Sequence, residues 1–160
     1  MSIEKARKHL SRWGKDSLVV EHEVSSATVE LAAQALNTEP GRIAKTLSFL
    51  NGERTLLVVA AGDARVDSSK FKKAFGIKKA RMVPAEEVEP RIGHAIGGVC
   101  PFGVNEGVDV WLDESLRRYA TVFPACGSSN SSIELSLDEL AECSEALGWA
   151  DVCKDWQGNA

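Results

Sequence analysis

The sequence lacks the features that mark a membrane protein, a secreted protein or a zinc protein. No apolar run approaches the roughly 20 residues that a membrane-spanning helix needs, and the first residues form no apolar signal region. The four cysteines form no Cys-x-x-Cys pair, and no Cys/His spacing matches a zinc site. We therefore expect a cytoplasmic protein with reduced thiols, no bound metal and no cofactor.

The chain also lacks internal repeats, low-complexity tracts and any stretch typical of an interdomain linker. Its 160 residues are enough to bury one core, and a composition of 44% hydrophobic and 26% charged residues is ordinary for a globular protein. We predict a single domain over residues 1–160.

The charges are distributed unevenly along the chain. Residues 1–80 hold 14 Lys/Arg and 9 Asp/Glu, a balance of +5, and residues 81–160 hold 5 and 14, a balance of −9; together they give the net charge of −4. A basic half can face an anionic partner such as RNA, although the same charges can also be mixed over a solvated surface.

Short strands are mixed with helices and do not form a regular βαβ repeat, which predicts an α+β fold. Helices are predicted over 2–13, 27–37, 68–75, from 84 onward and over 137–147, with a helical turn at 113–117. Strands are predicted over 17–22, 43–50, 53–61, 80–83, 108–112, 119–125 and 132–135. We expect Ser25 or Ser26 to cap the second helix, and Ser136 with Glu139 to form a capping box at the last one.

The clearest local signal is the Asn51-Gly52 pair between two apolar runs. This pair predicts a β-hairpin with a type I′ turn. The second run, Leu56–Ala61, is apolar on both faces, so we expect it to be a central strand of the sheet.

The stretch from Gly93 to Gly103 holds four glycines and one proline in eleven residues. Such a density excludes a helix and favours a bent backbone with exposed N–H groups. The Gly97-Gly98 pair lets main chain approach a ligand, and successive amides can bind a carboxylate, a phosphate or a developing oxyanion. A tight structural loop would have the same composition.

Lys45 is the most informative single residue. Strand alternation places it on one face with Leu47 and Phe49, and places Thr46 and Ser48 on the other face. A lysine beside two large apolar side chains needs a partner, so it can line a pocket and hold an anionic or carbonyl group. Alternatively, it lies at the strand end and extends to water.

Two further groups could contribute chemistry. Cys100 and His94 invite a cysteine-nucleophile hypothesis, but nothing in the sequence brings them within reach, and a small packed cysteine is the simpler interpretation. The hydroxyls of the polar stretch from Gly127 to Ser132 could bind a small ligand or merely connect two strands.

Taken together, three motifs resemble the YbaK/prolyl-tRNA-synthetase-associated domain family. They are Ala44-Lys45-Thr46-Leu47, Gly93-x-x-x-Gly97-Gly98-Val99-Cys100-Pro101-Phe102-Gly103, and Gly127-Ser128-Ser129-Asn130 before Ile133-Glu134-Leu135. The likeness runs from about residue 22 to about residue 145. It implies a mixed, mostly antiparallel sheet curled into a partly closed barrel with surrounding helices.

The resemblance also implies a function. Such a protein is a free-standing trans-editing enzyme that hydrolyses the ester of a mischarged aminoacyl-tRNA, often one for proline, with no metal. By position, the catalytic residues would be Lys45, Gly97 and Gly98. The substrate-binding residues would be His94, Val99, Cys100, Pro101, Gly127, Ser128 and Ser129. Cys100 stands where one branch of the family has serine, which leaves the amino-acid specificity open.

The resemblance implies that the partner is the acceptor end of aminoacyl-tRNA, with an aminoacyl-tRNA synthetase as a second candidate. We expect the protein to bind neither a membrane nor DNA. A basic group could contact the acceptor-stem phosphates: Arg42, Lys70, Lys72, Lys73, Lys78 and Lys79. Two other hypotheses stay open. One is a non-catalytic module that binds tRNA or a synthetase, and the other is a thiol enzyme that uses Cys100.

Overall fold

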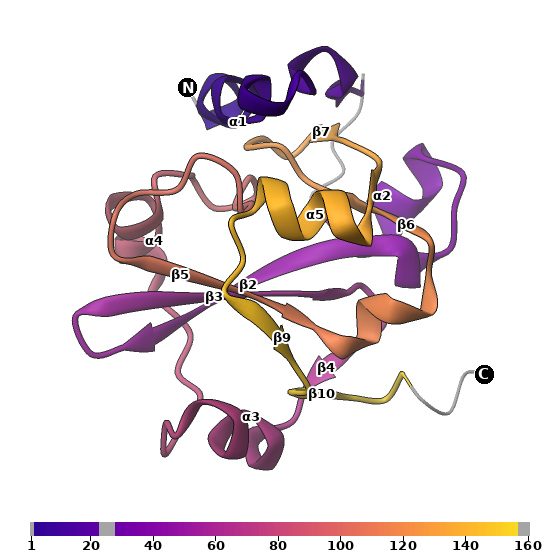
Figure 1. Cartoon of the computed structure of the whole chain (residues 1–160). Helices are drawn as coiled ribbons and strands as arrows, with labels where there is room; N and C mark the ends of the chain where they lie inside the picture. Colours follow the sequence, from indigo (N-terminus) through magenta and orange to yellow (C-terminus); the bar gives the residue numbers. More distant parts are fainter. Residues whose placement is uncertain (1, 23–27, 157–160) are drawn as a thin grey trace.

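A six-stranded mixed sheet forms the centre of the fold, in a computed structural model that describes residues 2–22 and 28–156 (Figure 1). In spatial order its strands are β8 (Leu135–Ser136), β6 (Thr121–Pro124), β2 (Ile43–Asn51), β3 (Arg54–Ala61), β5 (Val108–Asp113) and β9 (Gly148–Ala150). Two short pairs accompany it: β1 (Val20–Glu21) with β7 (Ser131–Ser132), and β4 (Arg65–Val66) with β10 (Cys153–Lys154).

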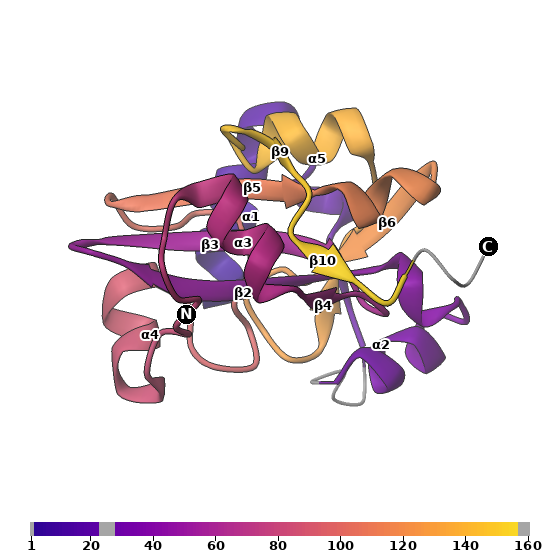
Figure 2. The ribbon, with the colours of Figure 1, turned by 90° about the horizontal axis from the view of Figure 1, so that it is seen from below.

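The strand pairing confirms an α+β fold with a mixed sheet, but the expectation of a mostly antiparallel sheet is wrong. Within the six-stranded sheet two strand pairs are antiparallel, β2–β3 and β6–β8, and three are parallel, β2–β6, β3–β5 and β5–β9. The sheet is curled into a half-barrel, with helices around it (Figure 2). These helices are α1 (Ser2–Leu10), α2 (Val29–Ala35), α3 (Ser68–Phe75), α4 (Ala85–Ile92) and α5 (Leu137–Cys143). None of the helices in the described ranges is long and apolar enough to cross a membrane.

The β2–β3 hairpin is confirmed, but its predicted type I′ turn is wrong. Asn51 pairs with Arg54, so Gly52 and Glu53 are the central residues, and of these two only Gly52 has a positive φ, +62°, as in a type II′ turn. β3 lies between β2 and β5, and residues 55–61 are all buried, as its two apolar faces predict. The hairpin therefore fixes the register of β2, the strand that carries Lys45.

The ends of α3 and α5 are capped by side chains and, at α3, by a glycine. The Asp67 carboxylate accepts from the Ser69 and Lys70 amides at the start of α3, and Gly76 ends that helix at a φ of +69°. Ser136 and Glu139 form the expected capping box at α5. The α2 cap was wrongly predicted: Thr28 accepts from the Leu31 amide, whereas the proposed caps Ser25 and Ser26 lie outside the described residues.

Other boundaries differ from the prediction. The strand over 132–135 is divided into β7 and β8, the strand over 17–22 is limited to β1, and residues 80–83 contribute one bridge. The last helix ends at Cys143 and not at Leu147, because Glu145 takes a φ of +54° and the Leu147 N–H donates to the Val110 carbonyl as the chain joins the sheet as β9. β9 and β10 were not predicted, since strands of three and two residues carry little sequence signal.

Candidate active site

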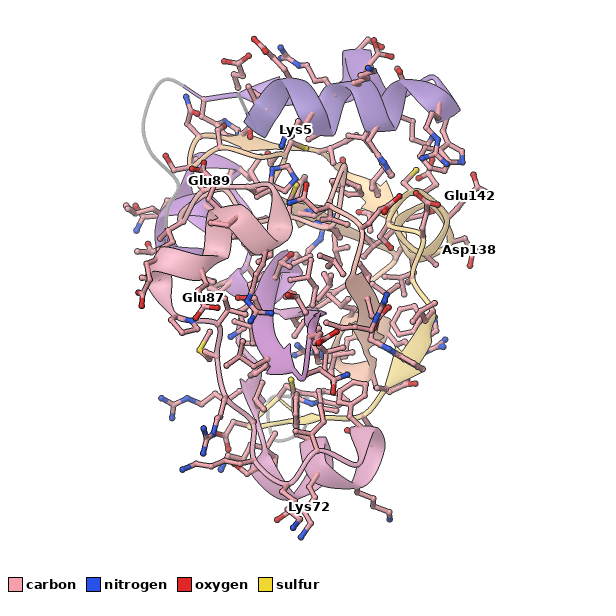
Figure 3. The ribbon with its side chains drawn as sticks, turned by 90° about the vertical axis from the view of Figure 1, so that its left-hand side faces the viewer. Lys5, Lys72, Glu87, Glu89, Asp138 and Glu142 are labelled. Atoms are coloured by element: carbon pink, nitrogen blue, oxygen red, sulfur yellow. The ribbon has the colours of Figure 1, made fainter. Side chains whose placement is uncertain are left out.

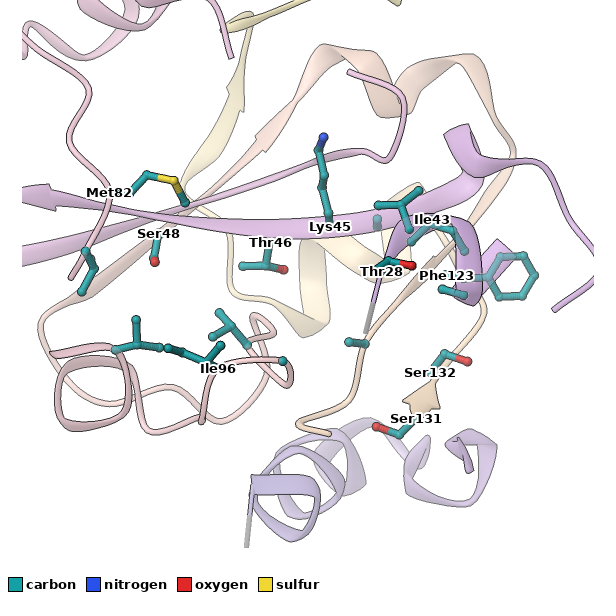
Figure 4. Close-up of a pocket in the computed structure, with 18 of the residues that line it drawn as sticks. Thr28, Ile43, Lys45, Thr46, Ser48, Met82, Ile96, Phe123, Ser131 and Ser132 are labelled. Atoms are coloured by element: carbon teal, nitrogen blue, oxygen red, sulfur yellow. The ribbon is translucent and has the colours of Figure 1, made fainter. Parts of the chain in front are cut away.

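A cavity of about 430 Å³ lies along β2, a size typical of small-molecule sites (Figure 4). β2 contributes one wall, and α2 and the start of α4 contribute others. The remaining walls come from the glycine stretch 93–103 and from the segment that includes β6 and β7. Its lining is largely apolar, with hydroxyls from Thr28, Thr46, Ser48, Ser131 and Ser132.

The cavity forms where the outer edge of β2 has no neighbouring strand. β6 pairs with β2 at Ile43 and Ala44 only. Further along, Val83 donates its N–H to the Ser48 carbonyl over 3.1 Å, and Leu50 donates to the Arg81 carbonyl over 2.8 Å. Residues 45–47 lie between these two contacts, so the edge of the sheet is open to a ligand there.

The backbone of Thr46 faces this open edge. Backbone groups alternate between the two edges of a strand, and Ser48 and Leu50 both bond outward to residues 81–83. Thr46 shares their orientation, so its N–H and C=O point toward the cavity rather than toward β3. Figure 4 shows its side chain directed into the same cavity, next to that of Ser48.

Lys45 lies on the opposite face of β2 from Thr46, as strand alternation predicts (Figure 4). Part of Lys45 lines the cavity, but its Nζ donates to the carbonyls of Gly62, over 3.3 Å, and Ala64, over 2.5 Å. Burial lowers the pKa of this ammonium from its usual value, because desolvation penalises the charged form.

The turn that receives the Lys45 ammonium is fixed by an ion pair. Arg118 donates to both carboxylate oxygens of Asp63, over 2.9 and 2.5 Å. The hydrogen bond from Arg118 holds the pKa of Asp63 below its usual value. Asp63 stands between the two carbonyls that Lys45 contacts, so the pair orients these acceptors.

The glycine stretch contacts the second predicted loop, the one that starts at Gly127. A Cβ on Gly98 would lie 2.6 Å from the Gly127 carbonyl oxygen, so only glycine fits there. The Gly98 N–H donates to the Ala95 carbonyl over 2.9 Å, which makes it part of a turn. Gly97, at a φ of +90°, and Val99 line the cavity, and their N–H groups have no hydrogen-bond partner within the described ranges.

The structure divides the predicted site residues into two groups. Lys45, Gly97 and Val99 line the cavity, whereas His94, Cys100, Pro101 and Gly127 are buried behind the loop. The Ser128 hydroxyl is hydrogen-bonded to the side chains of Asn130 and Ser131, over 2.9 and 2.7 Å. Neither Ser128 nor Ser129 lines the cavity. The loop hydroxyls that reach the cavity belong to Ser131 and Ser132.

Cys100 and His94 do come together, but in an arrangement that does not suit a nucleophile. The Cys100 Sγ lies 3.5 Å from His94 Nε2, and both side chains are fully buried. Nε2 is 2.6 Å from the Phe102 carbonyl oxygen, so it carries the proton and donates it there. Burial raises the pKa of Cys100 to about 12, which keeps the thiol protonated. This geometry disfavours the thiol-enzyme hypothesis.

Sequence reasoning missed several cavity residues. Thr46 and Ser48 had a usable signal, because alternation already placed them together on one face of β2. Ile96 lies within the glycine stretch that the sequence singled out, whereas nothing in the sequence pointed to Met82 or Phe123, which reach the cavity through long-range packing. Within the described ranges no group of three or more His, Cys, Asp or Glu side chains is placed to hold a metal ion.

The site is thus a ligand-sized, largely apolar cavity with amides and hydroxyls at the open edge of a sheet, in an α+β domain. The chain belongs to the aminoacyl-tRNA editing domain family, whose sequence model matches residues 23–143. YwhH of Bacillus subtilis is 51% identical over 158 residues, which cover 98% of this chain and 100% of YwhH.

Two further similarities carry functional names. EbsC of Enterococcus faecalis, named as a candidate Cys-tRNA(Pro)/Cys-tRNA(Cys) deacylase, is 32% identical over 130 residues, 80% of this chain and 73% of EbsC. A crystal structure described as a candidate trans-editing enzyme for prolyl-tRNA synthetase superposes with a TM-score of 0.86. The two sequences are 33% identical, and the superposition covers 96% of this chain and 97% of the other chain.

Proposed function

We propose that this protein is a trans-editing aminoacyl-tRNA deacylase that hydrolyses the ester of a mischarged tRNA for proline. The observation that carries this proposal is the cavity at the open edge of β2, beside the glycine stretch, in a chain of the editing-domain family. The names of EbsC and of the trans-editing structure support the same reaction class. An aminoacyl-tRNA substrate also supports a cytoplasmic location, which is part of this proposal.

The reaction is an ester hydrolysis. Water adds to the ester carbonyl, the bond between that carbon and the ribose oxygen breaks, and a free amino acid and a tRNA with a terminal hydroxyl are released. The carbonyl oxygen becomes negatively charged in the transition state. The amides of Gly97, Val99 and Thr46 are the proposed donors to it, and one such donor contributes about 3 kcal/mol in other enzymes.

Lys45 has a proposed role on the substrate as well. Its ammonium would anchor the terminal ribose or the ester oxygens, and to do so it must exchange the Gly62 and Ala64 carbonyls for substrate oxygens. Its lowered pKa supports this role, because a partly desolvated ammonium gains more from an anionic or carbonyl partner than a hydrated one does.

Gly98 has a different proposed role from the one that its motif suggests. The Gly98 N–H already donates to the Ala95 carbonyl, so it is not a donor to the substrate in this proposal. Instead, the missing side chain of Gly98 allows the close approach to Gly127, and this approach positions Gly97 and Val99. The buried residues His94, Cys100 and Pro101 would support the loop from behind, and Ser128 would orient Ser131.

The apolar end of the cavity is the proposed site of amino-acid selection. Val29, Ala32 and Leu36 of the α2 segment line it together with Phe123. Lys45 is the only charged residue that lines the cavity in the described part of the chain, so an uncharged amino-acid side chain fits best. One methylene in such a pocket changes binding by roughly 1–3 kcal/mol, so a larger side chain is excluded by steric clash.

We propose that the hydrolysis needs no metal ion. Hydroxyls, amides and an ammonium group supply the polarity of the cavity, and none of these groups is a strong ligand for zinc or magnesium. Activity that survives dialysis against EDTA supports this part of the proposal, and loss that added Mg²⁺ or Zn²⁺ restores contradicts it.

The test is deacylation of a panel of charged tRNAs. A tRNA for proline carrying alanine, cysteine, serine or proline is incubated with the wild-type protein and with Lys45→Ala. The proposal predicts rapid hydrolysis of at least one mischarged species, intact prolyl-tRNA and loss of hydrolysis in the variant. If no species is hydrolysed while the tRNA still binds, the protein is a binding module for tRNA or for a synthetase.

A further inference from the structure

His22 and Ser132 form a hydrogen-bonded pair at the wall of the cavity. The His22 Nε2 lies 3.0 Å from the Ser132 Oγ. Ser132 is buried and lines the cavity, whereas His22 is partly exposed and does not line it. Figure 4 shows Ser132 on the opposite side of the cavity from β2. The hydroxyl of Ser132 therefore connects the interior of the cavity to an imidazole outside it.

The pairing of β1 with β7 places these two side chains on one face. Val20 lies directly opposite Ser132, and residues two apart on a strand share a face, so His22 and Ser132 are diagonal neighbours. The ladder continues beyond β1, where the His22 N–H donates to the Asn130 carbonyl over 2.6 Å. The Asn130 side-chain amide donates in turn to the His22 carbonyl over 3.0 Å. These bonds fix the backbone of His22 relative to Ser132.

The cavity lining does not itself supply a proton acceptor for ester hydrolysis. The attacking water must lose a proton, and the leaving ribose oxygen must gain one. Among the described residues that line the cavity there is no histidine, aspartate or glutamate, and the Lys45 ammonium is a donor. The ring nitrogens of His9 and His94 bond to backbone carbonyls outside the cavity. Of the three histidines of the chain, His22 is the one bonded to a side chain that lines the cavity.

We propose that Ser132 and His22 form a proton relay that serves as the general base of the hydrolysis. This inference rests on the proposed function and adds the proton acceptor to it. The attacking water gives its proton to the Ser132 Oγ while the Ser132 hydroxyl gives its own proton to the His22 Nε2. When the bond between the acyl carbon and the ribose oxygen breaks, His22 returns the proton through Ser132 to that oxygen. Ser132 contacts the water and is the catalytic residue, and His22 is a positioning residue that acts through it.

Steady-state deacylation of the hydrolysed mischarged tRNA tests the relay. Ser132→Ala and His22→Ala should each lower kcat by at least about 100-fold and leave KM within about threefold, as expected for the loss of a general base. The double variant should be no slower than the single variants, because both substitutions interrupt the same path. The matched controls are His9→Gln and Ser11→Ala, which lie away from the cavity and should keep the wild-type rate.

Added imidazole gives a readout that a purely structural role would not change. Because His22 is partly exposed, free imidazole can occupy the space that its ring leaves in His22→Ala. It should raise the rate of His22→Ala by about tenfold and leave that of Ser132→Ala unchanged, since the second variant lacks the hydroxyl that contacts the water. Hydrolysis by imidazole without protein is subtracted, and thermal unfolding checks that each variant is folded.

Three results would overturn the relay and keep the proposed deacylase. One is a wild-type rate in both alanine variants, and another is a loss in His22→Ala that imidazole does not restore. The third is an aminoacyl group on Ser132 in the mass spectrum of acid-quenched wild-type protein, because Ser132 would then be the nucleophile. A wild-type protein that hydrolyses no charged tRNA contradicts the proposed deacylase itself, and the relay with it.

Discussion

Gly98 and Gly127 approach each other so closely that a Cβ on Gly98 would lie 2.6 Å from the Gly127 carbonyl oxygen and 2.9 Å from the Ser128 nitrogen. This contact joins the glycine stretch to the loop that leads into Ser131 and Ser132. Gly103, the last residue of the glycine stretch, and Gly127 are 24 residues apart in the chain, yet the two loops form adjoining walls of one cavity.

Gly98→Ala should therefore separate the two loops. Its neighbours are backbone atoms that cannot rotate away, so we expect a loss of about 1–3 kcal/mol in the free energy of unfolding. The displaced Gly97 and Val99 should lower kcat/KM by at least about tenfold. Urea unfolding and deacylation measure the two effects.

The matched control for this variant is Gly107→Ala. Gly107 has a φ of +87°, and a Cβ there would meet no atom within 4 Å. It should lose about 1 kcal/mol from backbone strain and keep its deacylation rate. Equal activity of Gly98→Ala and Gly107→Ala would show that the close approach does not matter for catalysis.

Lys45→Met should lower kcat about 100-fold, because methionine keeps the side-chain length but removes the ammonium proposed to hold the substrate. KM and kcat for the hydrolysed mischarged tRNA measure this effect. A variant that retains the wild-type rate would assign Lys45 to the structure of the 62–64 turn alone.

A pH series of unfolding measurements tests whether the Lys45 ammonium is buried. Since burial lowers the pKa of Lys45 in the folded state, the unfolded chain binds the proton more tightly. Wild-type stability should rise relative to that of Lys45→Met as the pH increases from the lowered pKa to the ordinary value of 10.5, and stay constant above it. An opposite slope would contradict the burial of the charged group.

Cys100→Ala should keep deacylation within about tenfold of the wild-type rate, because its thiol stays protonated up to about pH 12 and His94 donates its Nε2 proton to Phe102. All four cysteines are buried and free, so a thiol reagent should label the native protein slowly and the urea-unfolded protein at four sites. Abolished activity in a folded Cys100→Ala protein would restore the thiol hypothesis.

The basic residues predicted to contact tRNA are not equivalent. Arg42 bonds to Glu134 and Thr121, and Lys70 bonds to Asp151 and the Cys153 carbonyl. Lys72 projects from α3, at the end of the molecule away from Glu87 and Glu89 of α4 (Figure 3). Only residues 78–81 lead directly to the cavity residue Met82.

The double variant Lys78→Gln/Lys79→Gln should therefore raise KM for aminoacyl-tRNA and reduce the salt dependence of binding. Each lost phosphate contact lowers the log–log slope by about 0.9, so the pair should lower it by up to about 2. Lys72→Gln/Lys73→Gln on α3 is the control and should leave the slope unchanged. The reverse result would place the acceptor stem on α3.

The parts of the fold that were predicted correctly depend on local chemistry. The Asn51-Gly52 pair located the hairpin although not its turn type, the helix predicted over 68–75 is α3, and alternation along β2 places Lys45 opposite Thr46. These signals need only the residues themselves. The glycine pattern also singled out Gly97, which lines the cavity.

The cavity itself could not be predicted, because it depends on pairings between distant segments. β6 and residues 81–83 leave the edge of β2 open at 45–47, and no local pattern specifies either contact. The same reason explains why Ser131 and Ser132, rather than Ser128 and Ser129, reach the cavity. The Lys45 ammonium points away from the Thr46 face of β2, because it donates hydrogen bonds to the Gly62 and Ala64 carbonyls on the opposite face.

The most direct test of the account asks whether the ester is hydrolysed in this cavity. Ala32 of α2 lines the cavity, and Ala35 of the same helix is exposed and does not. Single-turnover deacylation of the hydrolysed mischarged tRNA is measured for Ala32→Phe and Ala35→Phe, alongside their thermal unfolding. The account predicts that Ala32→Phe loses hydrolysis by at least about 100-fold while folded and that Ala35→Phe keeps it. Equal rates in the two variants would contradict the assignment of the reaction to this cavity.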